Sequence, residues 1–180
     1  SLDTAAVVAA DPAVSFALAD DHTYDVQASV TAAGGTLTRS DISAGELVID
    51  TTPPTITLNP ISPDGAGASV INGFEQNQPV TLTGTTTAQV GSTVTLTCLD
   101  STSATLFTAT ATVQAGTAGG ANTFSIPVTG AAIGALTDGT YTPQVSVTNL
   151  FGLTGTDTES LRVDTTAPSA PTVALPEALG

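Results

Sequence analysis

The chain has 180 residues, of which 16 are acidic and only 2 are basic, giving a net charge of −14 at pH 7. This charge argues against nucleic acids and anionic membranes as partners, because both require basic patches. Charged residues make up 10% of the chain and hydrophobic residues 41%, so the composition is that of a folded protein and not of a disordered acidic tail. No stretch approaches the roughly 18 apolar residues of a membrane span.

Between residues 51 and 164 the sequence contains seven short segments in which apolar and polar residues alternate. Alternation with a period of two is typical of half-buried strands. Seven such strands, separated by turn residues, predict an all-β fold: an antiparallel β-sandwich of the immunoglobulin type. The predicted strands are Thr55–Leu58, Pro79–Gly84, Thr93–Leu99, Leu106–Val113, Phe124–Val128, Tyr141–Val147 and Leu161–Val163.

Particular residues sharpen this prediction. Pro127 and Pro143 fall inside two strands and should lie at sheet edges or bulges, because proline cannot donate a ladder hydrogen bond. Cys98 alternates with Val94 and Leu96, so we expect a buried, inert thiol. Asp138–Tyr141 enters the sixth strand and predicts a tyrosine corner, in which the phenol bonds to the backbone just upstream.

Two phrases of the sequence occur twice. Val48–Pro54 returns as Arg162–Pro168, with an offset of 114 residues, and Asp21–Tyr24 returns as Asp138–Tyr141, with an offset of 117. A tandem repeat of this length is the size of a small domain with its own core. We therefore predict the C-terminal part of one repeat at residues 1–50, a complete repeat at 51–164, and a linker with the first strand of the next repeat at 165–180.

The linkers between these repeats are short and contain proline. Asp50–Pro54 and Asp164–Pro168 read DTTPP and DTTAP. Proline fixes its own φ and restricts the residue before it, so each linker is predicted to act as a semi-rigid spacer.

Several of these phrases resemble the bacterial Ig-like repeats of large RTX and biofilm-associated surface adhesins. The resemblance rests on Val70–Glu75, Val80–Thr85, Leu136–Tyr141 and Val163–Pro168, and it covers most of residues 20–175. It implies a secreted extender at the bacterial cell surface, in which copies in series hold a distal ligand-binding domain away from the cell. Neighbouring repeats would be the partners, together with host or biofilm surface ligands, and calcium ions at the junctions would stiffen the array.

Acidic residues near the repeat junctions give calcium a physical basis, because Ca²⁺ takes six to eight oxygen ligands. Like charges at a seam repel one another unless a cation neutralises them. Since alternate loops of a sandwich share one pole, the first junction is predicted to gather Asp20, Asp21, Asp50, Asn149 and Asp157. The second is predicted to use Asp138 and Asp164, on the pole that also carries Asp64 and Asp100, completed by residues beyond Gly180. The alternative is that Asp50, Asp138 and Asp164 only form turns.

Nothing in the sequence points to catalysis. His22 is the only histidine and lies in a predicted turn, where the second copy of the phrase has Gly139. No zinc-ligand spacing or phosphate-binding loop is present. An enzyme is therefore not predicted.

The sequence also raises three other functions. Loops at one pole could bind a glycan or protein, with Phe151 as an exposed anchor. The chain could be a subunit of a surface filament or phage fibre that completes its sandwich with a neighbour's strand. Two threonine-rich stretches, Thr81–Thr87 and Thr93–Thr97, could match ice, although exposed strand faces of a secreted protein explain them better.

Overall fold

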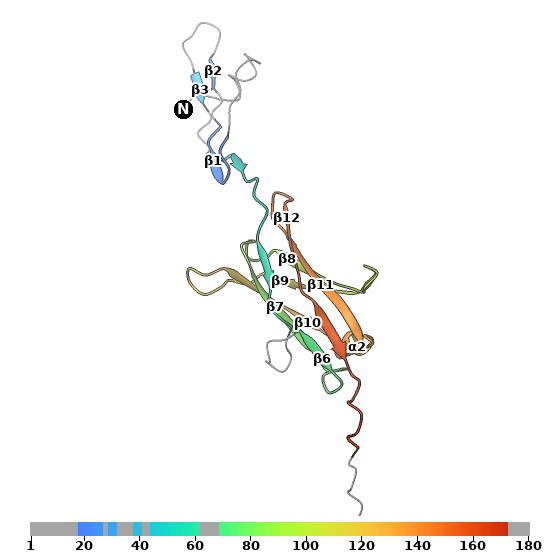
Figure 1. Cartoon of the computed structure of the whole chain (residues 1–180). Coiled ribbons are helices and arrows are strands. Elements are labelled where there is room, and N and C mark those ends of the chain that lie inside the picture. The colour runs from blue at the N-terminus through green and yellow to red at the C-terminus, as the bar shows by residue number, and fades with distance from the viewer. Residues whose placement is uncertain (1–17, 27–28, 32–37, 41–43, 62–68, 173–180) are drawn as a thin grey trace, which may run out of the picture. The chain divides into compact units, whose positions relative to one another are not determined.

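A computed structural model describes residues 18–26, 29–31, 38–40, 44–61 and 69–172, and it divides into two compact units, Ser1–Pro53 and Pro54–Gly180. Each unit is described by itself (Figure 1). In the described part of the chain, no helix has the length and apolar character needed to cross a membrane.

The second unit is a β-sandwich. Its smaller sheet has the strand order β10-β7-β5, and its larger sheet has the order β6-β13-β11-β8-β9, with β12 also paired to β11. All pairs are antiparallel except β6 with β13. The elements are β5 (Ile56–Leu58), β6 (Val70–Asn72), β7 (Val80–Thr86), β8 (Thr93–Leu99), β9 (Thr105–Thr112), β10 (Asn122–Val128), α2 (Gly130–Gly134), β11 (Gly139–Thr148), β12 (Thr154–Thr158) and β13 (Leu161–Asp164).

The core lies between the two sheets and is built from alternate residues of their strands, as the period-two pattern predicts. Phe124 on β10 is 2% exposed, and Leu96 on β8 and Val145 on β11 are 1% and 0% exposed. The Phe124 ring lies over Gly84, where an added Cβ would come within 2.3 Å of the ring. The all-β sandwich predicted from the sequence is confirmed.

The predicted strands are found with small shifts of their ends, and the structure adds β6, β12 and the short helix α2. Neither added strand carries a clear apolar alternation: β6 has only Ile71 buried, and β12 has the sequence TGTDT. Their backbone ladders hold them in place, with β6 paired to β13 and β12 paired to β11. Hydrophobic pattern therefore could not reveal them.

The two strand prolines lie where ladder bonds are not needed. Pro127 is on β10, an edge strand of the smaller sheet. Pro143 is on the central strand β11, at the point where the neighbouring ladder passes from β13 to β12. There Pro143 offers only its carbonyl, which accepts a hydrogen bond from the Glu159 N–H at 3.0 Å.

The first unit repeats one ladder of the second. In it, β1 (His22–Tyr24) pairs with β4 (Leu47–Ile49), and β2 (Ser29–Thr31) pairs with β3 (Thr38–Ser40). Tyr24 faces Leu47 as Tyr141 faces Leu161. The phrases that occur twice in the sequence thus form the same antiparallel pair in both units.

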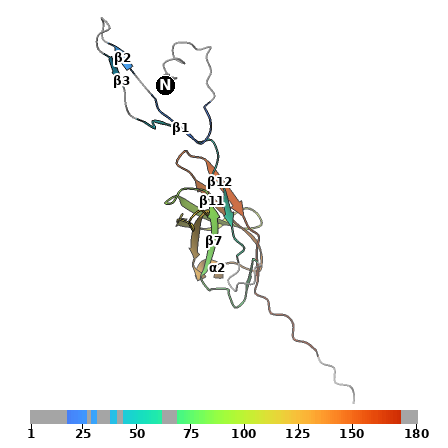
Figure 2. The same ribbon diagram turned by 90° about the vertical axis from the view of Figure 1, so that its left-hand side faces the viewer.

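The second unit has two distinct ends. We call the end with the β11–β12 turn its entry end, and the end with α2 its exit end (Figures 1 and 2). Pro54 packs against Gly155 near the beginning of β12, and Asp138, which follows α2, binds Thr165. The chain therefore runs through this unit from one end to the other.

Candidate linker joint

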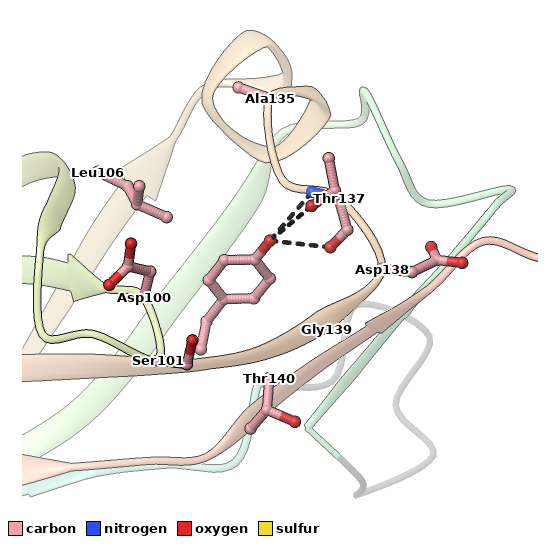
Figure 3. A pocket seen from close by; sticks show the side chains of 9 residues that line it. Asp100, Ser101, Leu106, Ala135, Thr137, Asp138, Gly139 and Thr140 are labelled. Atoms are coloured by element: carbon pink, nitrogen blue, oxygen red, sulfur yellow. Dashed lines mark hydrogen bonds between the residues drawn. The ribbon is translucent and has the colours of Figure 1, made fainter.

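A tyrosine corner fixes the loop that precedes strand β11. Tyr141 is 8% exposed. Its hydroxyl donates to the Thr137 carbonyl at 2.9 Å and accepts from the Thr137 N–H at 3.1 Å (Figure 3). The corner predicted from the sequence is present. Tyr24 makes a related contact in the first unit, where its hydroxyl accepts from the Ala19 N–H at 2.7 Å.

Asp138 follows this corner and binds the start of the outgoing linker. Its side chain points away from the Tyr141 ring (Figure 3). Its carboxylate accepts from the Thr165 N–H at 2.8 Å, the Thr165 hydroxyl at 2.6 Å and the Thr166 hydroxyl at 2.5 Å. The two threonines of the DTTAP phrase are thereby held against the exit end of the sandwich that they leave.

The first unit builds the same contact with Asp20. Its carboxylate accepts from the Thr51 N–H and the Thr52 hydroxyl, both at 2.5 Å. The repeated phrase aligns Asp138 with Asp21, but Asp20 occupies the equivalent position in the structure. The first unit has one more residue in this turn, and Asp21 absorbs it in a left-handed conformation with φ of 56°, which Asp tolerates better than most residues.

These donors hold both carboxylates in the charged form. Hydrogen bonds from Thr52 and Thr51 lower the pKa of Asp20 to about 2. Those from Thr165 and Thr166 lower the pKa of Asp138 to about 2. A lowered pKa means that the contact contributes stability above the usual carboxyl range near pH 4, and that this contribution is lost as the pH falls towards 2. The linker contact is thus intact at neutral pH and in mild acid.

The second unit holds the incoming chain equally closely. Pro54 is buried, and a Cβ on Gly155 would lie 1.9 Å from the Pro54 carbonyl oxygen, so only glycine allows this approach. Thr55 donates its N–H to the Thr87 hydroxyl at 2.9 Å and accepts from the Thr86 hydroxyl at 2.6 Å. One residue, Pro53, therefore lies between the threonines bound by the first unit and the Pro54 seat of the second.

Three more of the predicted calcium ligands have partners of their own in the structure. Asp50 Oδ1 accepts from the Thr52 N–H at 3.1 Å, as expected for a turn before proline. Asp157 Oδ2 accepts from the Leu58 N–H at 2.8 Å and ties β12 to β5. Asp164 forms an ion pair with Arg162 at 2.6 Å.

Within the described residues, no three acidic, histidine or cysteine side chains form a group that could hold a metal ion. Asp100 caps its own turn, and Asp64 lies outside the described residues. The prediction of ligands at the repeat junctions remains a prediction.

An open pocket of about 580 Å³ lies beside the tyrosine corner (Figure 3). Its lining residues are Asp100, Ser101, Leu106, Ala135, Thr137, Asp138, Gly139, Thr140 and Tyr141. The lining includes two carboxylates but no histidine, cysteine or basic side chain. His22 belongs to the first unit, where its Nδ1 bonds to the Asp20 carbonyl at 2.7 Å, and Cys98 is 0% exposed, with burial raising the pKa of its thiol to about 11.

Large apolar side chains are exposed at both ends of the second unit. Phe74 is 88% exposed and follows β6, next to Gly73, which approaches the Thr165 carbonyl at the exit end. Leu150 and Phe151 are 80% and 43% exposed in the β11–β12 turn at the entry end. Phe151 is thus partly accessible, so a glycan- or protein-binding role for this turn stays a prediction.

No protein-family model matches the chain, and no curated protein matches it. Among solved structures, the chain is similar to a bacterial immunoglobulin-like domain from the M. primoryensis ice-binding adhesin. Identity is 28% and the TM-score is 0.41, over 63% of this chain and 98% of that one.

Two longer structures are also similar. A tetra-tandem repeat in the extending region of a large adhesion protein shares 28% identity with a TM-score of 0.45, covering 78% of this chain and 31% of that one. A Ca²⁺-stabilized adhesin that helps an Antarctic bacterium bind ice shares 27% identity with a TM-score of 0.44, covering 80% and 32%. The chain spans about a third of the length of these two. The similar structures are thus Ig-like domains and repeats of large bacterial adhesins, the class that the sequence resembles.

Proposed function

We propose that this chain is an extender segment of a large bacterial surface adhesin, a semi-rigid length of stalk outside the cell that presents a distal binding domain. One observation carries the proposal: an aspartate binds two successive linker threonines at the end of both units. A stalk that extends by tandem repeats needs similar joints between them, so that each added repeat lengthens it in the same way. Its immediate partners are the neighbouring repeats.

The stiffness of the joint follows from how few backbone torsions are left free. Thr51 and Thr52 are bound to Asp20 on one side, and Pro54 and Thr55 are seated on the other. The residue between them is a proline, whose φ is fixed by its ring. A Gly/Ser tether of the same length would leave every torsion free.

Replacing Asp20 with alanine should loosen the joint between the two units. Spin labels on Ala44→Cys and Ser125→Cys, both at exposed positions, would report the distribution of distances between the units in the full chain. Native Cys98 is buried and would not react. We expect a narrow distribution in the parent chain and one at least about twice as wide in Asp20→Ala, because Thr51 and Thr52 lose their acceptor.

Asp100→Ala is the matched control for this experiment. Asp100 also accepts from a threonine N–H and hydroxyl, but it does so within a turn of the second unit. It should leave the width unchanged. A parent distribution that is already broad, or an Asp20→Ala distribution as narrow as the parent's, would contradict the stiff-joint proposal.

Calcium stiffening of the junctions is a separate proposal. Melting of the full chain in EDTA and in millimolar calcium, with magnesium as the control, tests it, because a ligand that binds only the folded state raises the melting temperature. At 100 times its Kd, bound calcium would add about 2.7 kcal/mol. A calcium-specific rise that is lost in Asp50→Ala supports a site at the first junction. Equal melting temperatures in all three solutions would contradict the calcium proposal. The stiffness of the joint would then rest on its aspartate–threonine contacts.

A further inference from the structure

We propose that β9 is a pairing edge through which two copies of this chain associate side by side, with their β9 strands antiparallel. The partner is a second copy of the chain. This interaction surface is distinct from the joint, which acts along a single chain.

The other open edges of the sandwich are protected in ways that natural sheets commonly use. Strands β5 and β6 have only three residues each, and short edge strands offer little backbone to a partner. Strand β10 contains Pro127, which cannot donate to an added strand. Strand β12 is covered, because Asp157 accepts from Leu58 of β5 and Gly155 abuts Pro54.

Strand β9 has none of these protections. It spans eight residues, Thr105–Thr112, with the sequence TLFTATAT, and it contains no proline and no charged side chain. It is the last strand of the larger sheet and pairs only with β8. The register shift in that pair lies at Cys98/Leu99, near the beginning of β9, so the rest of the strand pairs regularly. Long, regular, uncharged edges are the ones that recruit further strands.

The hydrogen-bonding direction of β9 can be assigned from its end. The Val113 N–H donates to Ser92 at 2.8 Å, on the β8 side. Because successive residues of a strand point their backbone groups to opposite sides, the N–H and C=O groups of Thr108 and Thr110 face away from β8. Gln114 follows the same alternation and bonds to Thr123 of β10. In the described part of the chain, this bridge is the only pairing on the outer side of β9.

The stretch of sequence that contains β9 carries no charge in a strongly acidic chain, and the carboxylates of Asp100 and Asp138 line the pocket beside Leu106 at the beginning of the strand. Residues 101–137 contain no charged side chain, although the whole chain has 16 acidic residues. This stretch includes both β9 and β10, which lie beside each other on the same flank. Two copies that pair through Thr108–Thr112 therefore bring no like charges directly opposite each other, so a second copy of this acidic chain meets no local charge repulsion along this part of the edge.

Antiparallel pairing of two β9 strands gives a closed, two-fold contact, because wherever residue i of one copy faces residue j of the other, residue j of the first copy also faces residue i of the second. Thr108, Thr110 and Thr112 are exposed on one face, and threonine–threonine pairs across strands are favourable. One strand pair buries less than the roughly 1,000 Å² of a stable interface, so we expect weak association per repeat. Several repeats acting together would multiply this affinity through effective concentration.

Sedimentation of the full chain from micromolar to millimolar concentration tests the proposal. We expect a dimer whose fraction rises with concentration. Thr110→Pro removes an outward N–H without touching the β8 ladder and should weaken dimerisation at least tenfold. Thr110→Glu adds a carboxylate to each copy at the paired edge, where the two like charges repel each other, and should do the same. Circular dichroism melting would show whether each variant is folded. If the proline variant does not fold, Thr110→Glu alone tests the proposal.

Thr81→Glu is the matched control, because it adds the same charge at an exposed position of β7, away from the edge. It should dimerise like the parent chain. The proposal is overturned if the parent chain stays monomeric throughout, or if the dimer survives both Thr110 substitutions. It is equally overturned if Thr81→Glu dissociates the dimer, since added charge would then act regardless of position.

Discussion

Replacing Phe124 with alanine is expected to lower the free energy of unfolding of the second unit by about 3–5 kcal/mol. The Phe124 ring is 2% exposed and fills the space above Gly84. Because glycine has no side chain, Gly84 cannot fill this space once the ring is removed. Truncation therefore leaves a cavity between the sheets. Thermal melting should show the transition of this unit falling by on the order of 10 °C or more.

Phe74→Ala provides the matched control for this substitution. Phe74 is 88% exposed, so the same change of side chain should alter the unfolding free energy by no more than about 0.5 kcal/mol. Equal losses for the two phenylalanines would show that the sandwich is not packed around Phe124 as described.

Gly155→Ala is expected to destabilise the second unit by about 1–3 kcal/mol, the usual range for overpacking. The added Cβ would lie 1.9 Å from a backbone atom, the Pro54 carbonyl oxygen, so β5 or β12 must move. Urea unfolding would measure the loss. Hydrogen exchange of the Thr55 and Leu58 N–H groups should accelerate. Both groups lie just after Pro54, which packs against Gly155, and their hydrogen bonds to Thr87 and Asp157 would be strained.

Gly139→Ala is the comparison for this glycine. An added Cβ there would find its nearest neighbours at 3.9 Å and 4.0 Å, so alanine fits. It should be neutral or slightly stabilising, by up to about 1 kcal/mol, because alanine restricts the unfolded chain. Destabilisation by both substitutions to the same extent would argue against a special role for the Pro54 seat.

The strands that the sequence predicts well are those whose stability comes from burial. Val94, Leu96 and Cys98 alternate into the core, and the alternation is visible in the letters. Strands β6 and β12 were not predicted, because they are held by hydrogen bonds to β13 and β11 and bury few apolar side chains. A backbone ladder leaves little trace in the sequence unless one of its faces is apolar.

The joint was predicted in part. The sequence indicated short, proline-containing linkers with aspartates near them. The repulsion between those carboxylates led to the prediction of calcium at the junctions. It could not show that Thr165 and Thr166 lie within reach of Asp138, because the partners are 27 and 28 residues apart. Nor could it distinguish Asp20 from Asp21, since the extra residue in that turn is accommodated by a left-handed backbone. The threonine pair in both linker phrases was the available signal.

The parallel pairing of β6 with β13 determines how the second unit would respond to tension. Val70 is the end of β6 nearer the N-terminus and faces Arg162, whereas Asp164, where the chain leaves, faces Asn72. A pull on the two ends of the chain drags these strands past each other in opposite directions along their length. The three residue pairs of this ladder would then be loaded together in shear and would not separate one after another.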